Sequence, residues 1–262
     1  MDEGRYLYCI VNNCSNENFG DIGIEESNVY TIVYKDIGAV VHKCAPKPYE
    51  TKDEKVVKEW LLAHQYVIDE ATKKFGTVIP FSFDTIVKGD EEKVKLLLEE
   101  EYNTFKDRLE KFKDKAEYTV QIFSDESAIM KEINENYPEI KKSKEEIEKK
   151  SKGTAYMLNK KLEAKIKEIY KDILERYAKE FYANIKNHVD DIKVDSKNKP
   201  VPDKWKDKQM VINLFCLVHK DKVDGLGRIL DELNKKEGFS VRFTGPWAPF
   251  SFVCEEIGRR KA

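Results

Sequence analysis

The sequence predicts an α+β protein with two domains, and three observations lead to this fold class. The chain has 262 residues, enough for two domains of ordinary size. Short runs rich in β-branched and aromatic residues alternate with longer segments whose apolar residues recur at steps of three and four. One pair of strand runs is separated only by Lys35 and Asp36, which indicates a hairpin and an antiparallel sheet. We expect domains over 1–122 and 123–262, each a mainly antiparallel sheet covered by helices in a ferredoxin-like arrangement.

The first domain is expected to carry its helices on one face of the sheet. Strands are predicted at 5–11, 29–34, 37–44 and 77–83. Helices are predicted at 53–75 and 90–114. The apolar stripe of the first helix consists of Val57, Trp60, Leu61, His64, Val67, Ile68, Ala71 and Phe75. Because His64 lies within this stripe, we expect a buried structural histidine there rather than a metal ligand.

The second domain has the order of elements of a ferredoxin-like fold. Strands are predicted at 117–123, 210–218, 239–244 and 250–257. Helices are predicted from 124 to about 136, at 154–189 and at 222–237. The helix at 154–189 is long and amphipathic, with apolar residues advancing mostly by fours. The charged run 141–152 is interpreted as a solvated helix face or loop, and 193–208 as a polar connection.

Composition excludes several classes of protein. The 47 basic and 49 acidic residues give a formal net charge of −2, so a basic footprint for nucleic acid is not expected. No stretch reaches the run of about 18 apolar residues that a membrane span needs. The acidic start, MDEGRYLYCIV, does not resemble a signal peptide. Five scattered cysteines are expected to be reduced thiols of a cytoplasmic protein: Cys9, Cys14, Cys44, Cys216 and Cys254.

Residue patterns typical of catalysis or cofactor binding are missing. The four histidines lie far apart in the sequence, and none is spaced from a second ligand as a metal site requires. Gly225 and Gly227 resemble part of a dinucleotide fingerprint, but the third glycine is replaced by Leu230. We interpret them as a helix start that lets the backbone pack closely on a strand. No catalytic, cofactor-binding or metal-binding residue is therefore expected, and an enzyme is not expected.

The segment FTGPWAPFSFV, residues 243–253, allows two interpretations. In the structural one, Gly245, Pro246 and Pro249 shape a turn and Trp247 lies over the sheet as a lid. In the functional one, Trp247 and Phe250 are exposed anchors for a partner protein, because aromatic residues dominate binding hot spots. The partner-binding candidates are Tyr6, Tyr8, Pro246, Trp247, Phe250 and Phe252.

The same segment resembles the C-terminal signature of the gas vesicle GvpF/GvpL family, whose usual form is close to LTGPWPPYSFV. Three further segments resemble the family in the same order. These are GRYLYCIV at 4–11, AHQYVIDEATKKFGTVIPFSFDTIV at 63–87 and SKGTAYMLNKKL at 151–162. Together they extend the resemblance from one end of the chain to the other.

The chain departs from the family pattern at several positions. Cys9 stands where the family often has Gly, and Ala248 and Phe250 replace a Pro and a Tyr. Ser82 and Asp84 replace the common Arg and Gly of the central segment. Any contact that this arginine makes in relatives is therefore not expected in this chain.

The resemblance implies an accessory or minor structural protein required for gas vesicle formation. It implies no enzymatic activity and a location in the cytoplasm and at the gas vesicle. The implied partners are the small, apolar major shell protein and other accessory gas vesicle proteins. The alternatives are a small-molecule-binding regulatory module, by analogy with other ferredoxin-like domains, and an enzyme without a readable motif.

Overall fold

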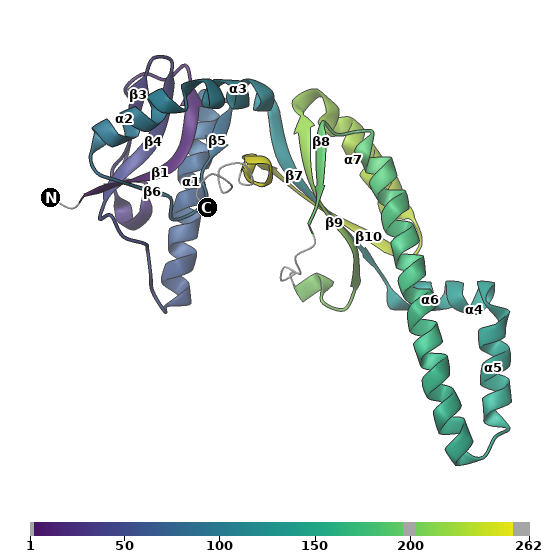
Figure 1. Ribbon diagram of the computed structural model, residues 1–262. Helices are drawn as coiled ribbons and strands as arrows, with labels where there is room; N and C mark the ends of the chain where they lie inside the picture. The colour runs from purple at the N-terminus through teal and green to yellow at the C-terminus, as the bar shows by residue number, and fades with distance from the viewer. Residues whose placement is uncertain (1–2, 196–202, 254–262) are drawn as a thin grey trace. The chain divides into compact units, whose positions relative to one another are not determined.

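The computed structural model describes residues 3–195 and 203–253, and their contacts divide them into two compact units (Figure 1). The first unit contains residues 3–117 and 245–253, and the second contains the described residues of 118–244. Both units combine an antiparallel sheet with helices, as the sequence predicts. The boundary differs from the expected one, because 245–253 packs with the first unit and not with the rest of the C-terminal half.

The sheet of the first unit is built around its first strand. In chain order the strands are β1 (Gly4–Asn12), β2 (Asn18–Gly20), β3 (Val29–Tyr34), β4 (Ile37–Cys44), β5 (Val78–Pro80) and β6 (Ile86–Lys88). They are arranged in the order β2-β3-β4-β1-β5, and β6 also pairs with β1. The expected hairpin is confirmed, with Lys35 in a left-handed conformation at φ 53° in its turn.

Helices cover both faces of this sheet rather than one. The helices are α1 (Glu54–Phe75), α2 (Glu91–Glu100) and α3 (Tyr102–Phe112), and a short 3₁₀ turn lies at Ile24–Glu26. Tyr6 and Tyr8 of β1 belong to a core cluster that includes residues of α1. Leu7 and Ile10, which lie outside that cluster, are equally buried, so the other face is covered as well. The expectation of a one-sided sheet was wrong.

The start and end of α1 follow ordinary capping rules. Asp53 accepts a hydrogen bond from the Lys55 N–H at 2.9 Å, and Gly76 ends the helix at φ 78°. The single helix expected at 90–114 is instead two helices, because Glu101 leaves the helical conformation at φ −102° and ψ 14°. The strand expected at 77–83 is shorter, and β2 and β6 are additional short strands.

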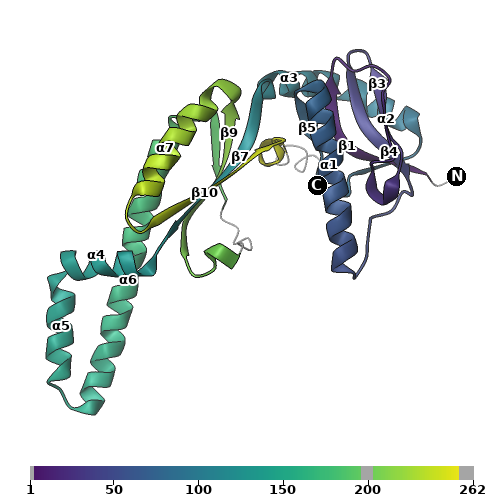
Figure 2. The same cartoon turned by 180° about the vertical axis from the view of Figure 1, so that it is seen from behind.

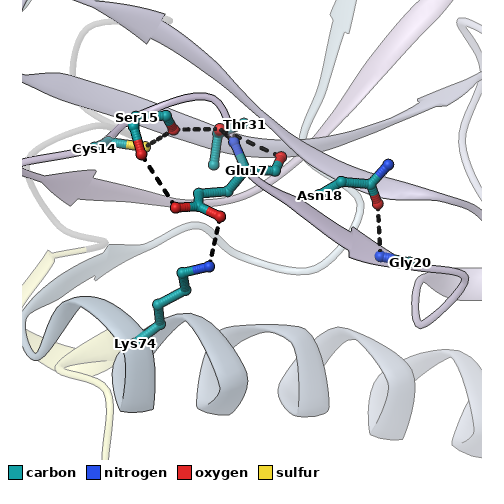
Figure 3. A network of polar contacts seen from close by, with 7 residues as sticks. All are labelled: Cys14, Ser15, Glu17, Asn18, Gly20, Thr31 and Lys74. Atoms are coloured by element: carbon teal, nitrogen blue, oxygen red, sulfur yellow. Dashed lines mark hydrogen bonds and ion pairs between the residues drawn. The ribbon is translucent and has the colours of Figure 1, made fainter.

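A polar network holds the loop between β1 and β2 against the sheet and α1 (Figure 3). The hydroxyl of Thr31 accepts from the Glu17 N–H at 2.8 Å and donates to the Ser15 carbonyl at 2.9 Å. The Glu17 carboxylate in turn accepts from Ser15 Oγ and pairs with Lys74 Nζ at 2.6 Å. The loop is therefore fixed to both β3 and the last turn of α1.

The sheet of the second unit has four strands within the described residues. They are β7 (Lys115–Ser124), β8 (Asp191–Val194), β9 (Gln209–His219) and β10 (Phe239–Trp247), in the order β10-β7-β9-β8. Three of them match the strands expected at 117–123, 210–218 and 239–244. The fourth, β8, lies partly in the segment expected as a connection. It pairs antiparallel with β9 from Asp191 opposite Leu217 to Val194 opposite Leu214.

The helices of the second unit include the expected long one. They are α4 (Glu126–Asn136), α5 (Pro138–Glu148), α6 (Lys152–Lys186) and α7 (Val223–Lys235), with 3₁₀ turns at Asp203–Trp205 and Lys220–Lys222. The helix predicted at 154–189 is confirmed as α6, and most of the charged run 141–152 lies in α5. Figures 1 and 2 show α5 beside the first part of α6, in a helical hairpin that extends away from the sheet. The later part of α6 packs against β9 and α7.

The last described residues form a helical turn and not the strand expected at 250–257. Phe250–Val253 is helical, and 254–257 lies outside the described residues. Pro249 suits the first position of a helical turn, because it has no N–H that would be left unpaired there and its ring fixes a helical φ. Its carbonyl accepts a hydrogen bond from the Phe252 N–H at 3.1 Å. The Ser251 N–H and hydroxyl both donate to the Glu117 carboxylate at 2.7 Å. Local hydrogen bonding thus outweighs the alternation of aromatic residues that favoured a strand.

Candidate partner-binding surfaces

Tyr6 lies in the core of the first unit and not on its surface. Its side chain is completely buried, and its hydroxyl lies 2.9 Å from His64 Nδ1. The other nitrogen of His64, Nε2, lies 3.2 Å from the Phe81 carbonyl, which can only accept. Nε2 therefore carries the proton, the Tyr6 hydroxyl donates to Nδ1, and the Asp84 N–H donates to the Tyr6 oxygen at 3.0 Å. The expected structural role of His64 is confirmed.

Tyr8 is buried in the same way by a second tyrosine–histidine pair. Its hydroxyl lies 2.7 Å from His42 Nδ1 and accepts from the Ile24 N–H at 3.1 Å. His42 Nε2 lies 3.0 Å from the Tyr49 hydroxyl. Because both tyrosines are completely buried, neither presents a side chain to a partner, and the assignment of Tyr6 and Tyr8 as partner-binding residues is corrected.

Burial keeps this network uncharged. It lowers the pKa of His42 to about 4, and it lowers that of His64 to about 4 against a smaller opposing effect of the Phe81 carbonyl. The same loss of solvation raises the pKa of Tyr6 and Tyr8 well above the ordinary value. The groups are neutral near pH 7 and serve as hydrogen-bonding partners inside an aromatic core.

The C-terminal motif divides into a buried half and an exposed half. Ala248, Phe252 and Val253 are buried, and the ring of the half-buried Phe250 lies 6.3 Å from that of His64. Pro246 is exposed, and 41% of Trp247 is accessible. The interpretation of Trp247 as a buried lid therefore does not fit. Of the candidates in this motif, Pro246 and Trp247 lie at the surface and Phe252 belongs to the interior.

A further apolar surface on α1 was not anticipated. Leu61, Leu62 and Tyr66 are 47%, 59% and 50% exposed, and we call these three residues the α1 apolar face. Leu62 and Tyr66 are one helical turn apart and therefore neighbours. The buried stripe of α1 consists of Trp60, His64, Val67, Ile68 and Ala71. The sequence placed Leu61 in that stripe wrongly. One feature of the sequence could have revealed this surface: α1 has more large apolar residues than a single buried stripe accommodates.

The remaining motifs do not assemble into a catalytic or metal site. Among residues 3–195 and 203–253, no group of three His, Cys, Asp or Glu side chains could hold a metal ion. The four cysteines in that part of the chain form no disulfide, and Cys254 lies beyond it. A side chain at Gly227 would meet open space, so the close packing suggested for this glycine is not required. None of the described helices is long and apolar enough to span a membrane.

Comparison with known proteins identifies the family. A family model described as "Gas vesicle synthesis protein GvpL/GvpF" matches residues 4–254, and the chain belongs to this family. Gas vesicle protein L1 of Halobacterium salinarum is 30% identical to it over 99% of this chain and 93% of the relative. Gas vesicle protein L of Haloferax mediterranei is 27% identical over 97% of this chain and 88% of the relative.

Solved structures of the family have the same fold. GvpF from Anabaena sp. PCC7120 matches with a TM-score of 0.72 and 18% identity, over 96% of this chain and 98% of that one. GvpF from Microcystis aeruginosa matches with a TM-score of 0.66 and 16% identity, over 95% and 98%. The α+β fold is thus shared despite low identity. The family is described by a role in gas vesicle synthesis and not by a reaction.

Proposed function

We propose that this protein is an accessory protein of gas vesicle formation that binds the apolar major shell protein during assembly. Membership of the GvpL/GvpF family gives the role in gas vesicle formation. The α1 apolar face is the observation that supports the partner. It exposes roughly half of each of three large apolar side chains on one helix. Trp247 of the same unit adds a fourth exposed apolar side chain.

Exposed apolar side chains on a regular element suit a partner that is itself apolar. Burying such surface yields about 25 cal/mol for each Å² removed from water. Lys58 and Glu59 are exposed on the same helix and would supply the polar rim of such an interface. A shell subunit with an uncovered apolar face is prone to aggregate before it is assembled. Covering that face until the subunit reaches the growing shell would explain why an accessory protein is needed.

The proposal is tested by co-expressing this protein with tagged major shell protein. The measured quantities are the fraction of shell protein that stays soluble after centrifugation and the amount of this protein retained on the tag. In the variant Leu61→Ser, Leu62→Ser, Tyr66→Ser we expect both quantities to fall at least fivefold. Since the three side chains are already exposed, the fold of the variant should be unchanged, which circular dichroism checks.

The matched control is Tyr156→Ser, Met157→Ser on α6, where the two side chains are 61% and 65% exposed. This control should bind like the unchanged protein, because the proposal assigns the shell contact to α1. Equal loss in both variants would indicate non-specific apolar adhesion. Retention of shell protein by the α1 variant would overturn the proposal. A rise in melting temperature with a metabolite, without any shell protein, would favour a regulatory module instead.

We also infer that the second unit is ferredoxin-like and that the two units behave as domains. The order β10-β7-β9-β8, with helices before β8 and after β9, supports the first inference. The separation of contacts into two units supports the second. We further infer a cytoplasmic location, which is favoured by scattered cysteines that form no disulfide within the described residues.

A further inference from the structure

A cavity with a volume of about 520 Å³ lies in the first unit. Its lining comes from the 3₁₀ turn at Ile24–Glu26, the end of β4, the loop between β4 and α1, and α1 itself. Pockets that bind small molecules have volumes of about 300–1,000 Å³, so the size suits a ligand. The charged and aromatic residues of the lining are Glu25, Lys43, Lys47, Tyr49, Glu50 and Trp60. We call this feature the loop cavity.

Two aromatic rings form a fixed part of the wall. The centroids of the Tyr49 and Trp60 rings lie 5.2 Å apart, and the ring planes are inclined by 74° to each other. Tyr49 is held at both ends, because its hydroxyl lies 3.0 Å from His42 Nε2 and its N–H donates to the Asp84 carboxylate at 3.0 Å. Trp60 belongs to the buried stripe of α1. The rings are therefore in place before a ligand binds, which lowers the entropy cost of binding.

The charged groups of the loop cavity are not balanced by the protein itself. Lys43 Nζ pairs with the Glu3 carboxylate at 2.8 Å, so its charge is already matched. Within residues 3–195 and 203–253, the side chains of Glu25, Glu50 and Lys47 form neither an ion pair nor a hydrogen bond. Two carboxylates thus stand against one ammonium group, and the cavity attracts a cation more than an anion.

The carboxylate of Glu25 lies close to the aromatic wall. Burial raises the pKa of Tyr49, and the nearby Cys44 and Glu25 raise it further. Glu50 is the next residue after Tyr49 in the chain, and it lines the same cavity. Both unpaired carboxylates therefore lie beside the rings, where they would be next to a bound cation.

We propose that the loop cavity binds an organic cation, whose ammonium or guanidinium group lies against the Tyr49 and Trp60 rings and beside the two unpaired carboxylates. Aromatic rings attract such groups electrostatically, and ionised carboxylates form strong hydrogen bonds with them. Among the described residues no third metal-binding side chain joins these carboxylates, so a metal ion is a poorer fit. The cation belongs to a basic side chain of a partner protein or to a free small molecule, since both present the same chemistry. The site is separate from the α1 apolar face, and its test uses no shell protein.

Nuclear magnetic resonance titration of the full chain is the first measurement. The ligand is acetyl-arginine-amide, and its matched control is acetyl-citrulline-amide, which has nearly the same shape without the charge. We expect a saturable shift of the Trp60 indole N–H signal with the arginine compound, and at least tenfold weaker binding of the citrulline compound. Similar binding of butylguanidinium would show that a free small molecule suffices, whereas much tighter binding of the peptide acetyl-GRG-amide would favour a side chain of a polypeptide. Equal binding of the charged and neutral compounds, or no saturable shift, would overturn the proposal.

Substitutions in the charged part of the lining are the second measurement. In the variant Glu25→Gln, Glu50→Gln we expect at least fivefold weaker binding of acetyl-arginine-amide. Because both side chains are exposed, the fold of this variant should be unchanged. Lys47→Gln should strengthen binding at least twofold, because it removes a like charge from the cavity. Glu110→Gln on α3 is the matched control, and it should bind like the unchanged chain.

Substitutions of Tyr49 test the role of the rings. Tyr49→Leu removes one ring and should weaken binding at least fivefold, while Tyr49→Phe keeps the ring and should bind within twofold of the unchanged chain. Unchanged affinity in Glu25→Gln, Glu50→Gln would overturn the proposal, as would tighter binding of acetyl-glutamate-amide than of acetyl-arginine-amide. Should Tyr49→Leu fail to fold, the carboxylate variant still decides.

Discussion

At the scale of single residues, the interior of the first unit depends on polar groups that are matched in pairs. Tyr6 pairs with His64 and Tyr8 with His42, each inside an aromatic cluster. A buried polar group without a partner would destabilise the fold by a few kcal/mol, so each member of a pair makes burial of the other tolerable. The opening strand therefore uses its two tyrosines to organise the core.

Acid should destabilise the protein through these histidines. Burial places the folded-state pKa of each near 4, below the ordinary value of 6.5, so the unfolded chain binds more protons between these pH values. The contribution of each neutral histidine to the free energy of unfolding is fully present above about pH 6.5. It is lost as pH falls towards about 4, which lowers the free energy of unfolding by roughly 3 kcal/mol for each histidine. Urea unfolding from pH 7 to 4.5 measures the free energy. His64→Gln should show a shallower loss than the unchanged chain, and an identical loss would contradict the assignment.

Removing one hydroxyl should reveal the strength of the network. Tyr6→Phe leaves His64 Nδ1 and the Asp84 N–H without their partner, so we expect the free energy of unfolding to fall by about 1–3 kcal/mol. Tyr34→Phe is the matched control, because its hydroxyl binds Glu99 at an exposed site, and it should change stability by less than about 0.5 kcal/mol. Equal effects in urea unfolding would show that the buried hydroxyl has no special role.

At the scale of elements, a buried carboxylate hydrogen-bonds a short helical turn to the rest of the first unit. Glu117 is 5% exposed and accepts two hydrogen bonds from Ser251, the first of them from its backbone N–H. Bonds to a charged acceptor are worth about 1.5–3 kcal/mol each. The position of Phe250–Val253 therefore depends on a residue more than a hundred positions earlier in the chain.

Glu117→Ala should release this turn. We expect the Ser251 amide to exchange at least tenfold faster, which corresponds to about 1.4 kcal/mol or more of lost protection. The comparison is Glu110→Ala, whose carboxylate is 74% exposed and pairs only loosely with Lys113. Nuclear magnetic resonance follows the Ser251 amide in both variants. Unchanged protection of Ser251 in Glu117→Ala would mean that packing of the neighbouring side chains holds the turn by itself.

Most elements could be predicted from the sequence because their apolar periodicity is long. α1 and α6 have such patterns, and β9 is an almost continuous apolar run; the bounds of all three agree with the expected ones within a few residues. The break at Glu101 could not be predicted, since the apolar stripe continues through it and neither glycine nor proline marks it. β6 is only three residues long and depends on its pairing with Arg5 and its neighbours. Periodicity reports local structure, and these features are set by distant contacts.

The candidate site could be predicted less well than the fold. The aromatic residues of the opening strand were identified as candidates, but nothing in the strand's sequence indicated that histidines from β4 and α1 would pack against them. Trp247 and Phe252 belong to one motif and differ sharply in exposure, because Trp247 lies at the end of β10 whereas Phe252 lies in the helical turn. Both residues belong to the first unit, so their exposure depends on how each segment folds against that unit, which the local sequence does not encode.

At the scale of the whole molecule, the chain passes between the two units twice. β7 contains the first crossing, after Glu117, and β10 contains the second, before Gly245. Residues near the C-terminus therefore contribute to the core that the N-terminal strands form. Ala248 belongs to that core, and Phe250 packs against it.

This arrangement predicts which unit a C-terminal substitution weakens. Phe250→Ala removes a ring that packs on the core of the first unit, so the Tyr8 amide of β1 should lose protection by about 1–3 kcal/mol while that of Cys216 in β9 should not. Phe243→Ala, seven residues earlier, should leave Tyr8 unaffected, because Phe243 stacks on Tyr118 within the second unit. Hydrogen exchange of both amides tests this. The reverse pattern would contradict the division of the chain.

The double crossing also sets an order of events during protein synthesis. When residue 117 leaves the ribosome, the first unit still lacks Ala248 and Phe250, which are made after the whole of the second unit. At usual rates of translation the delay is on the order of ten seconds. A nascent chain therefore completes its second unit while the first is unfinished. A chain that ends before Ala248 would lack these residues of the first core, so only longer products present a finished first unit.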